Sequence, residues 1–300
     1  MALKKRRPAR PEPFVWLDGR YIHEAEPFLN LSDFQTASSI GFTLPLHAYG
    51  TTARHIDRYY ERLVENLRLG KLYAPLYLTE EAFGQAITDL LNKNRMFRSV
   101  AITAYLMLRY EVDTIGLQIP TTSLMLTCRM LEASGYPLHP KAYVNTFRAM
   151  RRPLLHWDGI AWIGDPLRWY AMHFAQRKGD KTMLLINDEN RVVGTPDHTL
   201  YILPNGGGGA LLTPPIEDGA VYDPIREIVP LLLRELGLTV EEQPLSEADV
   251  ESAEEVFLAS TVDGFIPLVG VNFRRFTSSL TARLTPLLNH SYFPEQDFNQ

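Results

Sequence analysis

The apolar positions in the first half of the chain change repeatedly between the period of a strand and that of a helix. Two stretches repeat apolar residues every three to four positions, and other stretches are rich in β-branched and aromatic residues. The predicted elements are a hairpin over Phe14 to Ile22, helices over Thr52 to Leu69 and Thr79 to Leu91, and strands over Val100 to Tyr110 and Thr122 to Met130. Antiparallel strands beside helices indicate an α+β arrangement.

The second half repeats this mixture after a Gly- and Pro-containing segment at Glu132 to Pro140. The predicted strands cover Lys141–Met150, Thr182–Asn187, Arg191–Val193, Thr199–Leu203, Ala210–Thr213 and Glu255–Ser260, and the helices cover Asp165–Arg177, Pro224–Leu236, Ser246–Ala253 and Phe276–Leu288. We interpret residues 1–12 as a flexible tail, 13–131 as an N-terminal lobe, 132–140 as a linker between lobes and 141–300 as a C-terminal lobe.

The composition is that of an ordinary globular protein and narrows the function classes. The chain has 300 residues, 45% of them hydrophobic, which is enough for one large domain or two smaller ones. A formal net charge of -5 argues against a general nucleic-acid partner. The basic cluster from Lys4 to Arg10 favours a solvated tail, with nuclear or nucleic-acid targeting as the alternative.

Cysteine use and hydropathy favour a cytoplasmic protein. Cys128 is the single cysteine, and its apolar neighbours predict a buried, inert thiol. No apolar stretch is long enough for a membrane span, and no signal-peptide apolar region follows the basic N-terminus. The histidines show no metal-ligand spacing, so no metal site is expected.

Three motifs in a fixed order carry a resemblance to a known family. They are His55 to Tyr60, then Phe174 to Gly179 with the strand Met183 to Asn187, and finally Glu254 to Thr261. With these motifs the chain resembles class IV aminotransferases, which depend on pyridoxal phosphate (PLP) and include branched-chain and D-amino-acid aminotransferases and aminodeoxychorismate lyase. The resemblance covers about Phe14 to Leu288.

The resemblance implies a two-lobed α+β fold, usually a homodimer, with PLP in the cleft between the lobes. It implies that an early helix and two later loops hold the PLP phosphate. The matching residues are Arg58 on the helix, Ser260 and Thr261 in the late loop, and Arg226 in the middle loop. The structural alternatives are that Arg58 pairs with a carboxylate on its own helix, Asp57 or Glu61, and that the hydroxyls only cap a strand.

The middle loop departs from the pattern. It contains Asp223, which adds negative charge near a phosphate, and Pro224, which has no N–H to donate. The glutamate that would pair with the pyridine nitrogen is replaced by Gly194, with Asp197 as a shifted substitute.

The lysine that would form the Schiff base is missing. Its matching position is Ile160 or Ala161, and no lysine occurs from Ala142 to Arg177. Neither side chain carries the primary amine that a Schiff base requires. Aromatic residues near this position pack together or partly fill the cleft; they are Trp157, Trp162, Trp169 and Tyr170.

These departures lead to a hypothesis with two alternatives. We predict a divergent family member that does not perform lysine-dependent transamination and binds PLP non-covalently, another phosphate ligand or an amino-acid-like molecule in its cleft. One alternative is an active PLP-dependent transaminase or lyase in which another group replaces the lysine. The other is a non-catalytic binding or structural subunit.

Overall fold

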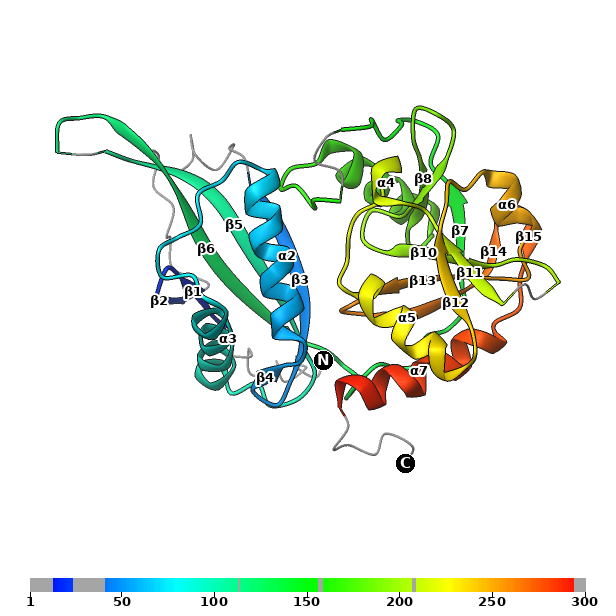
Figure 1. Cartoon of the computed structure of the whole chain (residues 1–300), viewed down its shortest axis with the longest axis horizontal. Helices are drawn as coiled ribbons and strands as arrows, with labels where there is room; N and C mark the ends of the chain where they lie inside the picture. Colours follow the sequence, from blue (N-terminus) through cyan, green and yellow to red (C-terminus); the bar gives the residue numbers. More distant parts are fainter. Residues whose placement is uncertain (1–12, 24–40, 113, 156–158, 207–208, 294–300) are drawn as a thin grey trace, which may run out of the picture.

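Two lobes lie side by side, joined by residues 131–141 (Figure 1). The computed structural model describes residues 13–23, 41–112, 114–155, 159–206 and 209–293. The expected tail at residues 1–12 lies outside the described residues. The sequence prediction of a two-lobed α+β fold is confirmed.

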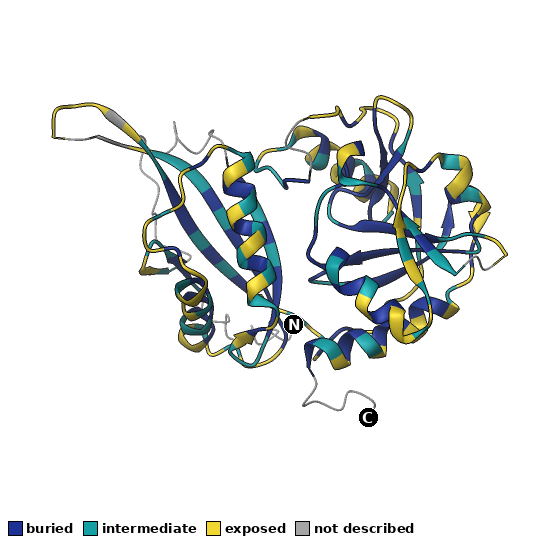
Figure 2. Ribbon diagram, in the orientation of Figure 1, coloured by how far each residue is buried: buried dark blue, intermediate teal, exposed yellow. Residues whose placement is uncertain are grey.

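The first lobe is an antiparallel sheet with helices packed against it. The strand order is β2-β1-β6-β5-β3-β4. The strands are β1 Phe14–Leu17, β2 Arg20–His23, β3 Gly41–Tyr49, β4 Thr52–Ala53, β5 Val100–Val112 and β6 Gln118–Met130, and the helices are α2 Ile56–Leu69 and α3 Glu80–Asn94. Both helices contribute buried residues to the core of this lobe and turn their exposed faces away from it (Figure 2).

The second lobe is built on a mixed sheet of nine strands with the order β12-β11-β10-β13-β14-β7-β8-β9, and β15 pairs with β14. The strands are β7 Ala142–Thr146, β8 Met183–Ile186, β9 Val192–Gly194, β10 Thr199–Leu203, β11 Ala210–Thr213, β12 Thr239–Glu242, β13 Glu255–Ser260, β14 Gly264–Val271 and β15 Arg274–Arg275. The helices are α4 Pro166–Lys178, α5 Ile225–Glu235, α6 Glu247–Ser252 and α7 Ser279–Tyr292. Helices α5 and α7 share one apolar core, and α6 packs into a second.

Capping residues in the sequence correctly predicted where some helices begin, whereas strand pairing shifted the start of another helix. Thr79 caps α3 and Asp165 caps α4, as expected. The helix predicted from Thr52 begins instead at Ile56, because Thr52–Ala53 pairs with β3 and His55 adopts a left-handed φ of 56°. Strand β3, which the sequence analysis did not predict, lies beside β5 along eight paired positions.

The strand predicted to run from Lys141 to Met150 is shorter than expected. It spans only Ala142–Thr146, and the chain beyond it rejoins the ladder of β8 at Arg152, whose backbone N–H donates to the carbonyl oxygen of Ile186 at 2.9 Å. Arg148 forms an ion pair with Glu247, and Arg152 is buried and forms an ion pair with Asp165.

Within the described ranges, no helix combines the length and apolar character of a membrane span.

Candidate functional site

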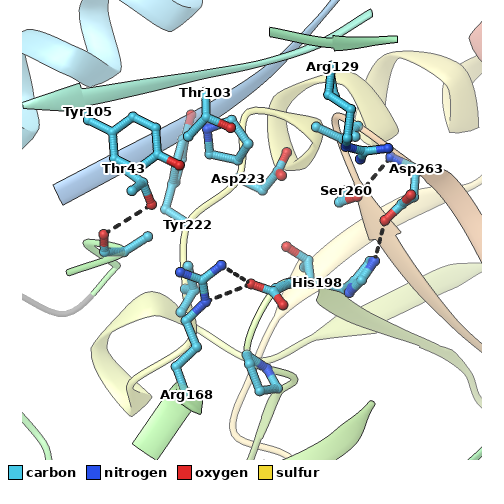
Figure 3. A pocket seen from close by; sticks show the side chains of 18 of the residues that line it. Thr43, Thr103, Tyr105, Arg129, Arg168, His198, Tyr222, Asp223, Ser260 and Asp263 are labelled. Atoms are coloured by element: carbon cyan, nitrogen blue, oxygen red, sulfur yellow. Dashed lines mark hydrogen bonds and ion pairs between the residues drawn. The ribbon is translucent and has the colours of Figure 1, made fainter. Parts of the chain in front are cut away.

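A cavity of about 550 Å³ lies between the lobes and is the candidate site (Figure 3). The first lobe contributes side chains from β3, β5 and β6. The second lobe contributes the first turn of α4, the loop after β9, the segment before α5 and the turn between β13 and β14. Both lobes therefore form one cleft, as the resemblance implied.

Ala161 occupies the cleft position at which the family lysine was expected. Its carbonyl oxygen accepts the backbone N–H of Thr43 at 2.9 Å, which holds this segment against β3. Ala161 lines the cavity, whereas Ile160 is fully buried in the core of the first lobe. The cleft-lining residues that the structure describes include no lysine.

The two hydroxyl residues of the late loop have different surroundings. Ser260 lines the cleft, and its Oγ accepts the backbone N–H of Asp263 at 3.1 Å. Thr261 is fully buried, and both its backbone N–H and its hydroxyl donate to the carboxylate of Asp223. The phosphate role of these residues stays a prediction, but Thr261 already has an anionic partner.

The two arginines expected near the phosphate are also paired with carboxylates. Arg58 donates to Glu227, whose hydrogen bond raises the pKa of the guanidinium; the partner is neither of the carboxylates on its own helix. Arg226 is buried and donates to the carbonyl oxygen of Pro214 at 2.9 Å and to Glu242 at 2.8 Å. Arg226 does not line the cavity.

The position expected to carry the ring-nitrogen glutamate has no side chain. Gly194 has a φ of 102°, and a Cβ there would approach the carbonyl oxygen of His198 to 3.0 Å. Asp197 lines the cleft nearby, but it forms an ion pair with Arg168 at 2.6 Å. Gly194 therefore meets a backbone constraint, and Asp197 already has a cationic partner.

The sequence analysis missed a histidine–aspartate pair in the cleft wall. Nε2 of His198 lies 2.9 Å from Oδ2 of Asp263, and both residues line the cavity. His139 contacts the backbone carbonyl of Asp263 at 2.7 Å. Burial by itself raises the pKa of the Asp263 carboxyl, but the hydrogen bond and charge of His198 outweigh burial and bring the pKa to about 2.

We expect His198→Phe to raise the pKa of Asp263 from about 2, because burial would no longer be opposed by the hydrogen bond and charge of His198. A carboxyl-carbon NMR titration measures this. His173→Phe is the control, because His173 is exposed on α4 and is not among the groups that shift the Asp263 pKa, so the pKa should stay close to 2. An unchanged pKa in His198→Phe would show that another group holds the carboxylate ionised.

The aromatic residues near position 161 do not fill the cleft. Trp169 is 64% exposed and stacks on His173, while Trp162 packs against the core of the first lobe. Neither they nor Tyr170 line the cavity, and Trp157 lies outside the described residues. The alternative that they line or partly fill the cleft is therefore wrong for the described members of the group.

Taken together, the cleft does not fit PLP in the manner that the resemblance implied. It offers no lysine, no carboxylate at position 194 and, at Thr261, donors that already serve Asp223. Among the residues described, no cluster of histidine, cysteine and carboxylate side chains could hold a metal ion.

Comparisons with known proteins agree with the fold. Residues 46–271 match the family model "Amino-transferase class IV". A putative branched-chain-amino-acid aminotransferase of Methanocaldococcus jannaschii is 26% identical over 284 residues, covering 93% of this chain and 94% of the relative.

Two solved structures superpose on nearly the whole chain. The branched-chain aminotransferase of Thermoproteus uzoniensis with norvaline has a TM-score of 0.79 and 20% identity, covering 95% of this chain and 96% of that one. The branched-chain amino acid aminotransferase of Thermobaculum terrenum in its PLP form has a TM-score of 0.75 and 20% identity, covering 97% and 96%.

Proposed function

Because the chain belongs to the class IV aminotransferase family, we propose that it is a divergent member that binds a small amino-acid-like molecule in its interlobe cleft without lysine-dependent transamination. The observation that carries the proposal is Ala161, a methyl group at the cleft position where the resemblance places the lysine. A primary amine is needed both to bond the cofactor and to move the substrate proton, and a methyl group does neither. Any PLP held in such a cleft is held non-covalently.

An amino-acid-like ligand suits the charges of the cleft. Arg129 on β6 lines the cavity, is exposed, and forms no ion pair with any described residue, so its guanidinium is open to a carboxylate. Thr103 and Tyr105 add hydroxyl groups from the same lobe (Figure 3). The Thermoproteus uzoniensis structure contains norvaline, which is an amino acid, and this supports the same ligand class.

The main rival is an active PLP-dependent transaminase or lyase in which another group, for example a lysine elsewhere in the chain, replaces the missing lysine. Lys181 is the native lysine to test, because its charge contributes to the low pKa of Asp263 in the cleft wall. Lys181 is exposed and does not line the cavity, which favours the proposal over this rival.

The proposal predicts that borohydride will not fix PLP to the wild-type protein. The purified chain is mixed with PLP, reduced, digested and examined by mass spectrometry, and no lysine should carry the cofactor specifically. Transamination of branched-chain amino acids should stay at the background rate. A specific adduct at Lys181, accompanied by turnover, would establish the rival instead.

Ala161→Lys is the matched positive control, because it places an amine at the cleft-lining position. Reduction should then fix pyridoxal, which lacks the phosphate, to position 161. If this variant forms no adduct although it is folded, residue 161 does not occupy the place assigned to it.

A further inference from the structure

A buried carboxylate lies at the point where the two loops expected to hold a phosphate meet. Asp223, which lines the cleft next to the start of α5, is only 5% exposed. Its carboxylate accepts the backbone N–H of Thr261 at 3.0 and 3.1 Å and the Thr261 hydroxyl. It also accepts the backbone N–H of Ile225 at 2.8 Å. We call these three donors the anion cup.

The anion cup has the chemistry of a phosphate site. Two backbone N–H groups and one hydroxyl converge on one point from a strand-end turn and from the first turn of an α-helix of 11 residues. Such donors favour an anion, and the helix dipole adds to the effect. The late loop and the middle loop that provide them are the two loops that the resemblance assigned to the phosphate. The position is thus occupied by a group of the chain itself.

The cationic support of this region is neutralised in the same way. Arg58 donates to Glu227, one helical turn beyond Asp223, and Glu227 also accepts the hydroxyl of Tyr222. Two carboxylates of one short segment therefore satisfy the groups that a ligand phosphate would require. A phosphate dianion entering the cleft would find these donors already occupied by the Asp223 carboxylate and could not bind there without displacing that side chain.

We propose that Asp223 is a built-in anion that takes the place of a ligand phosphate, so that the cleft selects unphosphorylated ligands. The inference rests on the proposed ligand-binding function and makes its ligand class narrower. It assigns Asp223 a role in specificity: the carboxylate completes the anion cup from within and excludes the phosphorylated form of any molecule that fits the rest of the cleft.

The test compares ligands that differ only in the phosphate. Pyridoxine 5′-phosphate and pyridoxine carry no aldehyde, so their binding is independent of any lysine, and inorganic phosphate probes the cup alone. Calorimetry on the wild-type chain should show no saturable phosphate binding and no preference for the phosphorylated vitamer. Asp223→Ala empties the cup, and we expect phosphate affinity to rise at least about ten-fold, together with a preference for pyridoxine 5′-phosphate.

Two further variants identify the origin of the gain. Glu217→Ala also removes one carboxylate, but this exposed side chain does not line the cleft and contacts none of the cup donors, so phosphate affinity should not rise. The double variant Asp223→Ala, Thr261→Val lacks the hydroxyl donor and should lose most of the gain. An equal gain in Glu217→Ala would mean that net charge alone controls phosphate binding, which overturns the proposal.

The wild-type measurement is decisive even if Asp223→Ala fails to fold. Wild-type protein that binds pyridoxine 5′-phosphate about ten-fold more tightly than pyridoxine, with shifted amide NMR signals of Thr261 and Ile225, would overturn the inference. The proposed function has a separate readout, the lysine adduct formed with PLP under borohydride, so either idea can fail without the other.

Discussion

Glu255→Ala is expected to lower the free energy of unfolding by about 3 kcal/mol or more, because it leaves several buried donors without a partner, each at a cost of about 1 to 3 kcal/mol. Glu255 is fully buried at the start of β13. Its carboxylate accepts the backbone N–H of Leu280 at 2.9 Å and that of Thr281 at 2.8 Å, as well as the Thr281 hydroxyl. Alanine would leave these donors buried without a partner and remove the negative charge from the N-terminus of α7.

Chemical denaturation of the variant measures this loss. Glu254→Ala is the matched control, because no hydrogen bond of its side chain holds α7, and it should change the free energy by no more than about 0.5 kcal/mol. Glu255→Gln keeps the shape of the side chain and one acceptor oxygen, so its loss of unfolding free energy should fall between those of Glu255→Ala and Glu254→Ala. A loss below about 1 kcal/mol for Glu255→Ala would mean that water or another side chain replaces the carboxylate.

The second large effect is expected from His47, which should make the protein less stable on mild acidification. His47 is 1% exposed, and its ring lies edge-on to the rings of Tyr136 and Phe293, with distances between ring centroids of 4.6 Å and 5.3 Å. Burial lowers the pKa of His47 from 6.5 to about 4. Between pH 4 and pH 6.5, the histidine binds a proton in the unfolded chain but stays neutral in the folded protein. Stability from this group is therefore complete above pH 6.5 and falls as the pH decreases toward 4.

The expected slope is about 1.4 kcal/mol per pH unit, and the whole loss is about 3 kcal/mol. Denaturation curves recorded from pH 7 to pH 4 measure it. His47→Phe fills a similar volume without a titratable group and should remove most of this slope. His173→Phe, at an exposed position on α4, should leave it unchanged. If the slope persists in His47→Phe, another buried group must take up the proton.

In the candidate site, motif matching located the donor groups but not the residue that binds them. The match of Ser260 and Thr261 to a phosphate loop was made from their order after β13, and the structure does place donors at this strand end. What the match did not contain was the partner, Asp223, which is 38 residues away in the chain. The substitution of Asp223 into the middle loop was visible, but its position relative to Thr261 was not, because it depends on how α5 and β13 pack.

The partner of Arg58 was also not predictable from the sequence, and it lies still farther away along the chain. The position of Arg58 on a helix followed from local periodicity, and the carboxylates considered as partners were its helical neighbours. The observed partner, Glu227, is 169 residues away and belongs to the other lobe. Ion pairs of this kind are decided by lobe packing, which no local pattern records.

The sequence by itself determined the family, the α+β class, the capped starts of α3 and α4, and the absence of a lysine between Ala142 and Arg177. These features follow from residue identity, short-range hydrogen bonds and apolar period, which act within a few positions of the chain. Only the tertiary structure decided that Ala161 rather than Ile160 faces the cleft, and that Asp223 occupies the anion cup. Both depend on contacts between segments that are distant in sequence, where packing and burial select one partner among many that the composition allows.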